Sequence, residues 1–289
     1  MVPSVSAAAT EGDPAPIGVF DSGMGGLTVL NALRRTLPDE AFLYLGDTAR
    51  LPYGTESPAT VQRYAVQAAQ ILVERGVKAL VIACNTASAV ALGELQRRYA
   101  PLPVFGVVEP GARAAATAPA ERVVVLATES TISGGAYQRA LLGLRPGLRV
   151  AGRPCPLLVA LAEEGRHAGD LARLAIQDYL HGLLPPGVRA GERIEPLTVL
   201  LGCTHFPVFR PVIEELLGAA VADVTIVDSA ATTAESVAAE LRAGRVHAAP
   251  PGRTDAALEL LATDGAARFR RVGRYFLHQS IDAVHLVDL

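Results

Sequence analysis

The sequence predicts an α/β fold made of two doubly wound parallel-sheet domains with pseudo-symmetry and the active site between them. Short apolar runs, typical of buried strands, alternate with amphipathic stretches of helical period through most of the chain. The chain has 289 residues, of which 50% are hydrophobic, and this is enough for two cores of ordinary size. One apolar run in each half ends in a cysteine, at Cys84 and at Cys203, and this echo suggests the pseudo-symmetry.

The first half is expected to fold as strands joined by helices. The expected strands are 17–20, 41–45, 78–84 and 104–108, and the expected helices are 27–37, 58–75 and a segment after Cys84 that runs to about Tyr99. Pro38 stops the first helix, because proline cannot continue a helical ladder. Ser57 and Pro58 are typical of an N-cap followed by proline in the first turn, and Gly76 indicates the end of that helix. At 109–111 (Glu-Pro-Gly) we expect the pattern to break.

The pattern restarts with a β-branched run at 122–126. Further strands are expected at 148–154, at the run that Cys203 closes and at 224–227, with helices at 136–144, 170–184 and up to about Leu217, and an apolar stretch at 157–165. The proline pairs at 185–186 and 250–251 indicate surface loops. We therefore expect a first domain of residues 1–108 and 227–289, in which 1–16 are a loose tail, and a second domain of residues 109–226.

Composition excludes several classes of function. The net charge is -3 and the pI about 6.1, so the chain has no basic field for a nucleic-acid backbone. The sequence has no apolar run long enough to span a bilayer, and residues 1–16 lack the basic and apolar regions of a signal peptide. Three cysteines cannot all pair and are typical of a reducing compartment, so we expect a cytoplasmic protein with free thiols and no membrane partner.

Lys78 is the single lysine of the chain. It opens the strand that Cys84 closes, and six residues of strand place its Cα about 20 Å from the thiol. Pyridoxal phosphate requires a lysine for its Schiff base at the site, so this cofactor is disfavoured.

Cys84 and Cys203 are the candidate reactive groups. The carboxyl ends of strands in an open α/β sheet are where chemistry is placed, and a helix that begins there favours a thiolate through its dipole. Inverting a carbon centre by proton transfer needs a base on one face and an acid on the other, and two thiols can supply both. The alternative is that each cysteine packs a core, since free cysteine is among the most buried residue types.

Four motifs occur in order at 18–27 (GVFDSGMGGL), 46–54 (GDTARLPYG), 83–88 (ACNTAS) and 202–207 (GCTHFP). Together they resemble the aspartate/glutamate racemase family, and within it the glutamate racemases. The resemblance implies a cofactor-free enzyme that interconverts L- and D-glutamate and supplies D-glutamate for peptidoglycan. It implies that Cys84 and Cys203 are the acid/base thiols. A homodimer is one oligomeric state that the resemblance allows. The resemblance also implies a set of residues that hold the substrate or tune the thiols, namely Asp21, Ser22, Tyr53, Gly54, Asn85, Thr86, Thr204 and His205.

These residue types suit those roles. Short hydroxyl and amide side chains, with free backbone N–H groups at strand-to-helix turns, can bind carboxylates without a long cation. His205 can hold the Cys203 thiol as an anion, and either Glu163 or Glu164 can orient it. Asp21 can accept from an ammonium group or cap a helix, and Cys155 is expected to be structural. Two positions depart from the family pattern: Phe206 replaces a common tyrosine, and Gly134 replaces a serine near Thr131.

Other classes of protein remain as alternatives. Gly23-x-Gly25 after the first strand and Asp47 after the second resemble part of a dinucleotide-binding fingerprint, although Thr28 stands where its third glycine belongs. A metal site at 203–205 would lack the paired ligand motifs of structural zinc. A non-catalytic regulatory protein on the same scaffold is a further alternative. Among racemases, aspartate is the rival substrate, since it differs from glutamate by one methylene.

Overall fold

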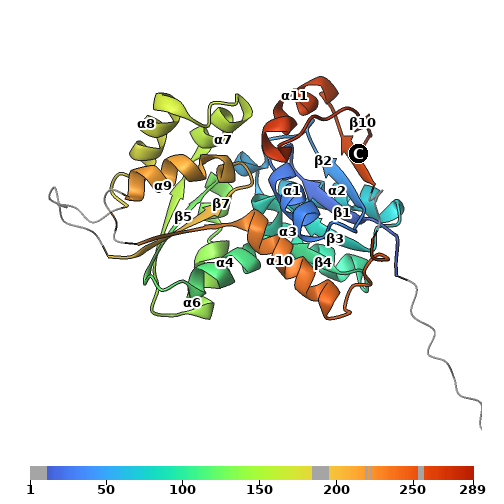
Figure 1. Cartoon of the computed structure of the whole chain (residues 1–289), viewed down its shortest axis with the longest axis horizontal. Helices are drawn as coiled ribbons and strands as arrows, with labels where there is room; N and C mark the ends of the chain where they lie inside the picture. Colours follow the sequence, from blue (N-terminus) through green and yellow to red (C-terminus); the bar gives the residue numbers. More distant parts are fainter. Residues whose placement is uncertain (1–11, 184–194, 219–220, 222, 253–256) are drawn as a thin grey trace, which may run out of the picture.

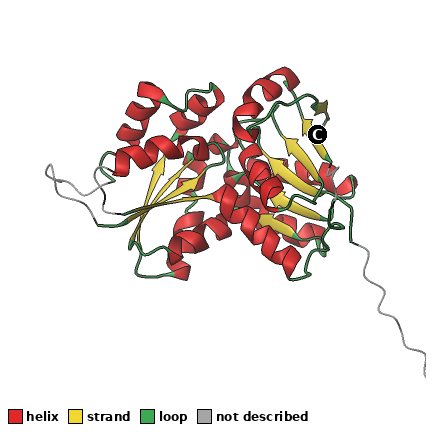
Figure 2. Cartoon of the chain, viewed as in Figure 1, coloured by secondary structure: helices red, strands yellow, loops and turns green. Residues whose placement is uncertain are grey.

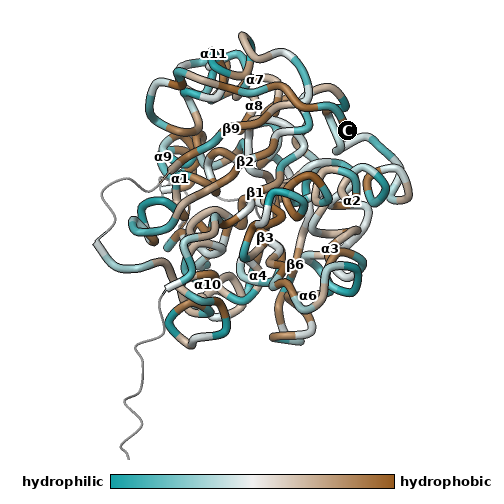
Figure 3. Tube along the Cα trace, turned by 90° about the vertical axis from the view of Figure 1, so that its right-hand side faces the viewer, coloured by the Kyte–Doolittle hydropathy of each residue, from teal (hydrophilic) through white to brown (hydrophobic). Residues whose placement is uncertain are grey.

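The computed structural model describes residues 12–183, 195–218, 221, 223–252 and 257–289. Its strands form two parallel sheets that lie side by side, each flanked by helices (Figure 1, Figure 2). The predicted fold class is confirmed. Hydrophobic segments such as β2 and β9 run through the interior in Figure 3, and hydrophilic segments lie mostly in the outer turns.

The first sheet has six strands in the order β10-β9-β2-β1-β3-β4. They are β1 (Ile17–Asp21), β2 (Phe42–Gly46), β3 (Ala79–Ile82), β4 (Val104–Gly106), β9 (Leu258–Ala262) and β10 (His285–Leu286). Side chains alternate between its faces, so Ile17 and Val19 pack in one core and Phe20 in the other. Both faces are therefore buried, as expected for a parallel sheet.

Two pairs of helices cover these faces. The helices are α1 (Leu27–Thr36) and α11 (Ala266–Leu277) on one face and α2 (Pro58–Glu74) and α3 (Asn85–Tyr99) on the other, with the short 3-10 helix η1 (Tyr53–Thr55) before α2. Ser57 caps α2 as predicted by accepting from the backbone N–H of Thr60, and Gly76 follows the helix with a φ of 74°.

The second sheet has four strands in the order β6-β5-β7-β8. Its strands are β5 (Arg122–Ala127), β6 (Arg149–Pro154), β7 (Leu197–Gly202) and β8 (Val224–Asp228). Its helical segments are α4 (Val108–Thr117), α5 (Glu129–Ser133), α6 (Ala136–Leu144), α7 (Pro156–Glu163), α8 (Gly169–Leu180), η2 (Phe206–Phe209) and α9 (Arg210–Gly218). Helices α4 and α6 cover one face, and α7, α8 and α9 cover the other.

The expected break at 109–111 is wrong, because helix α4 begins at Val108 and passes through these residues. Pro110 lies in the first turn, where its missing N–H costs no hydrogen bond. Gly111 faces the ring of Tyr137, 3.5 Å from the point where a Cβ would stand, so it allows α4 and α6 to pack closely. Helix α8 ends at Leu180, before the predicted 184, and residues 184–186 lie outside the described part of the chain.

After residue 228 the chain returns to the first sheet. Helix α10 (Ser229–Arg242) follows β8 and packs on α1, and β9 and β10 then extend the first sheet beside β2. No helix or strand is predicted for these elements from the sequence. Because β8 belongs to the second sheet and ends at Asp228, one residue past the predicted crossing at Val227, we propose that the domains divide after Asp228 and near Val108.

Lys78 has a structural environment. Its Nζ lies 2.6 Å from Glu40 Oε2 and donates to the carbonyl of Asp13 at 2.7 Å, and its side chain is only 3% exposed. Across the described residues, we find no helix with both the length and the apolar character needed to cross a membrane.

Candidate active site

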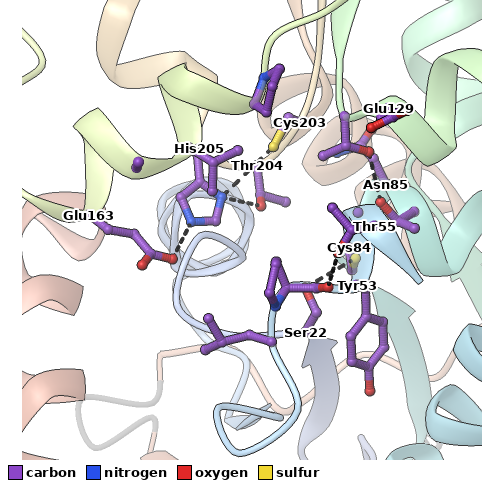
Figure 4. Close-up of a pocket in the computed structure, with 18 residues that line it drawn as sticks. Ser22, Tyr53, Thr55, Cys84, Asn85, Glu129, Glu163, Cys203, Thr204 and His205 are labelled. Carbon is purple, nitrogen blue, oxygen red and sulfur yellow. Dashed lines mark hydrogen bonds and ion pairs between the residues drawn. The ribbon is translucent and has the colours of Figure 1, made fainter.

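A cavity of about 280 Å³ opens where the carboxyl ends of the two sheets face each other. Its walls are segments that follow β1, β2, β3, β5, β6 and β7 in the chain, which is where ligands bind in open α/β sheets. The first sheet contributes Ser22, residues 51–55 and Cys84, Asn85 and Thr86; the second contributes Thr128, Glu129, Pro156, Val159, Ala160, Glu163, Cys203, Thr204 and His205. Both candidate thiols therefore border one cavity and come from different sheets (Figure 4).

Cys84 lies directly before α3 as its N-cap residue. Its thiol donates to Ser22 Oγ at 3.4 Å and accepts from the backbone N–H of Ala87 at 3.5 Å. Burial raises the pKa of the Cys84 thiol to about 12; the negative charge of Asp21 adds to this rise, and the bonds to Ser22 and Ala87 oppose it. At neutral pH Cys84 is thus a protonated thiol that can donate a proton.

Cys203 directly follows β7 and stands at the end of a polar chain. Its Sγ lies 3.8 Å from His205 Nδ1, and the Oγ1 of Thr204 lies 3.4 Å from the same nitrogen. On the far side of the ring, Nε2 lies 3.1 Å from Glu163 Oε1, and Glu163 Oε2 accepts from Arg268 Nη2 at 2.7 Å. The sequence left Glu163 and Glu164 open as the partner of His205; the contact belongs to Glu163, and Glu164 is exposed.

Each charged group in this series of contacts stabilises the charge of the next. Burial alone lowers the pKa of His205, but the hydrogen bonds and negative charges of Cys203 and Glu163 outweigh burial and raise the pKa to about 10. Burial pushes the pKa of Glu163 upward, and the contacts with His205 and Arg268 leave it below its ordinary value. At pH 7 an imidazolium ring therefore stands beside the Cys203 sulfur.

Replacement of this acid by its amide, Glu163→Gln, should destabilise the protein in a pH-dependent way. The raised pKa of His205 adds stability that is fully present below the unfolded value of about 6.5 and is lost as the pH rises through about 10. Without the carboxylate this contribution shrinks, although Asp21 and Cys203 still face the ring. We expect a loss of about 1.5–3 kcal/mol at pH 6.5, from the lost charged hydrogen bond, and a smaller loss at pH 10.5.

Urea unfolding of both proteins at the two pH values measures this difference. A deficit of equal size at pH 6.5 and pH 10.5 would show that Glu163 does not set the protonation of His205. Glu164→Gln is the matched control, because this neighbouring acid is exposed and lies outside the cavity lining, and it should change stability little at either pH.

Asp21 lies behind the cavity and not in its lining, unlike the other predicted site residues. It is fully buried, and its Oδ2 accepts from the backbone N–H of Gly23 at 2.9 Å and from the Tyr44 hydroxyl at 3.5 Å. Burial raises the pKa of Asp21, and the positive charge of His205 opposes this rise. Asp21 thus acts electrostatically on both Cys84 and His205 from behind.

The Gly-rich turn after β1 makes room for the Cys203 loop. A Cβ on Gly25 would lie within 2.3 Å of His205 Nδ1 and 2.5 Å of Thr204 Oγ1. The hydroxyl of Thr28 donates to the carbonyl of Thr204 at 2.9 Å, so α1 is tied to the same loop. The turn is filled by protein where a dinucleotide-binding fold needs space for a pyrophosphate, which disfavours the oxidoreductase alternative.

Asn85 and Thr86 begin α3 and contact residues near the second sheet. Asn85 Nδ2 donates to Ser229 Oγ at 3.3 Å, and Asn85 Oδ1 accepts from the Tyr137 hydroxyl at 2.6 Å. Thr86 Oγ1 lies 3.0 Å from Thr128 Oγ1. These bonds fix the start of α3, whose free N–H groups are suited to binding an anion.

We expect Tyr137→Phe to weaken this support. The variant removes the donor to Asn85 Oδ1 from a fully buried position, which costs about 1–3 kcal/mol. Both thiols remain in place, but the anion-binding turn at the start of α3 loosens. KM for the substrate should therefore rise several-fold more than kcat falls. Steady-state kinetics and thermal unfolding measure the two effects. In the control Tyr99→Phe, the lost hydroxyl donates to Val66 O at 3.2 Å in a half-buried place, and a KM change equal to that of Tyr137→Phe would contradict the assignment.

Tyr53 and Gly54 line the cavity in the loop that follows β2. The Tyr53 ring points away from the sulfur atoms in Figure 4, and its hydroxyl bonds the carboxylate of Asp47. A Cβ on Gly54 would lie 2.9 Å from the Cβ of Thr128, so here the two sheets' loops meet closely. The Tyr53 hydroxyl is therefore engaged by Asp47, and the use of backbone N–H groups at this turn stays a prediction.

The sequence missed part of the cavity wall. Thr128, which directly follows β5, could have been found by the strand-end rule that identified the thiols. Pro156, Val159 and Ala160 form an apolar wall from α7, for which the sequence holds no chemical signal. Thr131 is fully buried behind Thr128 and accepts from its hydroxyl at 2.9 Å, outside the cavity lining.

Two further sequence hypotheses concern cysteines and metals. Cys155 is buried in the core, and its thiol donates to the Arg153 carbonyl at 3.3 Å, in line with a structural role. In the part of the chain that the structure describes, His, Cys, Asp and Glu side chains form no group of three or more that could hold a metal ion.

Known proteins with a similar sequence or structure are racemases. Residues 17–237 match the Asp/Glu/Hydantoin racemase family. The chain is 46% identical to a glutamate racemase of Geobacter metallireducens over 274 residues, which cover 94% of this chain and 96% of that protein. It resembles the crystal structure of Thermus thermophilus glutamate racemase with β-chloro-D-alanine at 42% identity and a TM-score of 0.82, over 96% of this chain and 98% of that one.

A second solved structure, of Francisella tularensis glutamate racemase in complex with D-glutamate, matches with a TM-score of 0.83 and 33% identity. It covers 95% of this chain and 98% of the other. The fold, the two-thiol cavity and these likenesses define the class of protein as an amino-acid racemase, an isomerase. The chain belongs to the aspartate/glutamate racemase family, in which the glutamate racemases are the relatives it matches over nearly its full length.

Proposed function

We propose that this protein interconverts L-glutamate and D-glutamate by a two-base mechanism in which Cys84 and Cys203 face opposite sides of the substrate's α-carbon. The observation that carries the proposal is that two free thiols from different sheets border one cavity. One thiolate takes the α-hydrogen as a proton, and the other thiol donates its proton to the opposite face. The reaction is a proton exchange without net oxidation, so its balance needs no redox partner.

The cavity lining supports an amino-acid dicarboxylate as substrate. Neither lysine nor arginine is among the described residues that line it, so carboxylates would be bound by Ser22, Asn85, Thr86 and Thr204 and by backbone N–H groups near Gly54. The substrate ammonium group, placed near Cys84, would offset the negative charge of Asp21 and so lower the pKa of the Cys84 thiol from about 12. Substrate binding would then prepare Cys84 to act as a base.

The choice of glutamate rests on the relatives. The curated relatives carry the name glutamate racemase, and the Francisella structure holds D-glutamate. Aspartate differs by one methylene, which a pocket distinguishes by only about 1–3 kcal/mol. By the same likeness we propose that the product supplies D-glutamate for peptidoglycan, in the cytoplasm.

Optical rotation of pure L-glutamate in phosphate buffer tests the proposal. With the purified protein and no added cofactor, the rotation should decay to zero, and D-glutamate should behave in mirror image. L-aspartate under the same conditions should decay at least about tenfold more slowly. A constant rotation with both glutamate enantiomers would refute the proposed activity, and faster decay with aspartate would refute the proposed substrate.

A further inference from the structure

Helix α11 belongs to the first sheet but reaches the Cys203 side of the site. Its residues Phe269, Val272 and Phe276 are fully buried, and the ring of Phe269 packs edge-on against Tyr44 of β2 with 6.0 Å between centroids. The ring of Phe276 in turn packs edge-on against His205 at 5.2 Å. Arg268 lies eight residues before Phe276, about two helical turns, so it emerges on the same side of the helix.

Helices α11 and α7 meet beside the cavity. Arg268 Nη2 donates to Glu163 Oε2 at 2.7 Å, and the turn after α7 rests on α11, since a Cβ on Gly165 would lie 3.0 Å from Tyr275 Cζ. Figure 1 places α7 and α11 on the same side of the molecule, at the gap between the two sheets. Arg268 therefore reaches from the unit of one sheet to an acid on the unit of the other.

The two ends of this ion pair differ in environment. The Arg268 side chain is 47% exposed, whereas that of Glu163 is only 10% exposed. An ion pair between two exposed groups contributes little to stability, but a buried carboxylate that loses a partner is left with uncompensated charge. The buried Glu163 end makes this ion pair matter, because the same carboxylate also bonds His205.

We infer that Arg268 is a positioning residue for proton transfer at Cys203. It acts through Glu163, whose Oε2 it binds so that Oε1 faces His205 Nε2, and His205 in turn faces the Cys203 sulfur. It forms no contact with Cys84, so its influence falls on one of the two thiols. The inference rests on the proposed racemase activity and deepens it, since Cys203 then depends on a side chain supplied by the other sheet's unit.

Deuterium exchange in heavy water separates the two thiols. Each thiol abstracts from one enantiomer, so the enantiomer that the Cys203→Ser variant fails to exchange is the one that Cys203 faces. Arg268→Gln should slow α-hydrogen exchange from that enantiomer about tenfold, as for a shift of one pKa unit, and leave exchange from the other enantiomer within about twofold. Arg268→Lys, which keeps the charge, should recover most of the loss.

Two controls make the result specific. Arg271→Gln changes another exposed arginine of α11, which forms no ion pair among the described residues, and should match the wild type. Arg268→Gln added to Glu163→Gln should have little further effect, because both act through one carboxylate. Equal slowing of exchange from both enantiomers, or full additivity in the double variant, would overturn the inference. It would show that Arg268 only holds α7 and α11 together. Wild-type protein that exchanges neither enantiomer would instead refute the proposed function itself.

Discussion

Cys84→Ser and Cys203→Ser should each lower kcat for racemisation by about 10²–10⁴-fold, the range for loss of a general acid or base. A serine hydroxyl keeps the shape of the side chain but ionises far less readily than a thiol. In heavy water each variant should still exchange the α-hydrogen of the enantiomer that faces its remaining thiol. The two variants should therefore fail with opposite enantiomers, and proton NMR of L- and D-glutamate measures this directly.

Cys155→Ser is the matched control for these variants. Cys155 is a third free thiol of the same chain, buried in the core and absent from the cavity lining. It should lose some stability, because the hydroxyl enters an apolar site, and keep its kcat within a few-fold. If either Cys84→Ser or Cys203→Ser racemised glutamate at the wild-type rate, or if both failed with the same enantiomer, the assignment of the thiols to opposite faces would be wrong.

The parallel direction of the strands explains why the sequence predicted so many residues of this site. Both thiols directly follow buried apolar runs, at β3 and β7, and parallel strands bring their carboxyl ends to one edge. The same rule accounts for Ser22 after β1 and for the turn after β2. It depends only on local pattern, which is what a sequence shows most clearly.

The residues that the sequence could not assign depend on distant contacts. Glu163 and Glu164 are adjacent acids, and only the packing of α7 on the Cys203 loop places Glu163 against His205. Arg268 lies in a helix without a recognisable motif, and its contact with Glu163 arises because the chain returns to the first sheet after β8. Helix α4 was missed for a local reason, since proline and glycine near its start are usually read as breakers although the first turn tolerates proline.

Gly25→Ala should lower kcat by about 10²-fold or more, although it adds a single methyl group to a residue far from Cys203 in the sequence. The added Cβ would lie 2.3 Å from His205 Nδ1 and 2.5 Å from Thr204 Oγ1, closer than real Cβ contacts allow. The Cys203 loop must therefore move, and displacement of a catalytic group by about 1 Å can cost about 10²-fold in rate. Overpacking should also cost about 1–3 kcal/mol of stability.

The control for Gly25→Ala is Gly93→Ala, within α3. A Cβ there would meet only Arg97 Nη1 at 3.7 Å, so alanine should stabilise the helix by about 0.5–1 kcal/mol and leave kcat unchanged. Circular dichroism shows whether Gly25→Ala still folds, and deuterium exchange shows what it has lost. Because the clash falls on the partners of Cys203 and spares those of Cys84, exchange should fail mainly with the enantiomer that Cys203 faces. Folded Gly25→Ala protein with wild-type exchange of both enantiomers would mean that the close packing of the glycine turn against Thr204 and His205 does not hold the Cys203 loop in its working position.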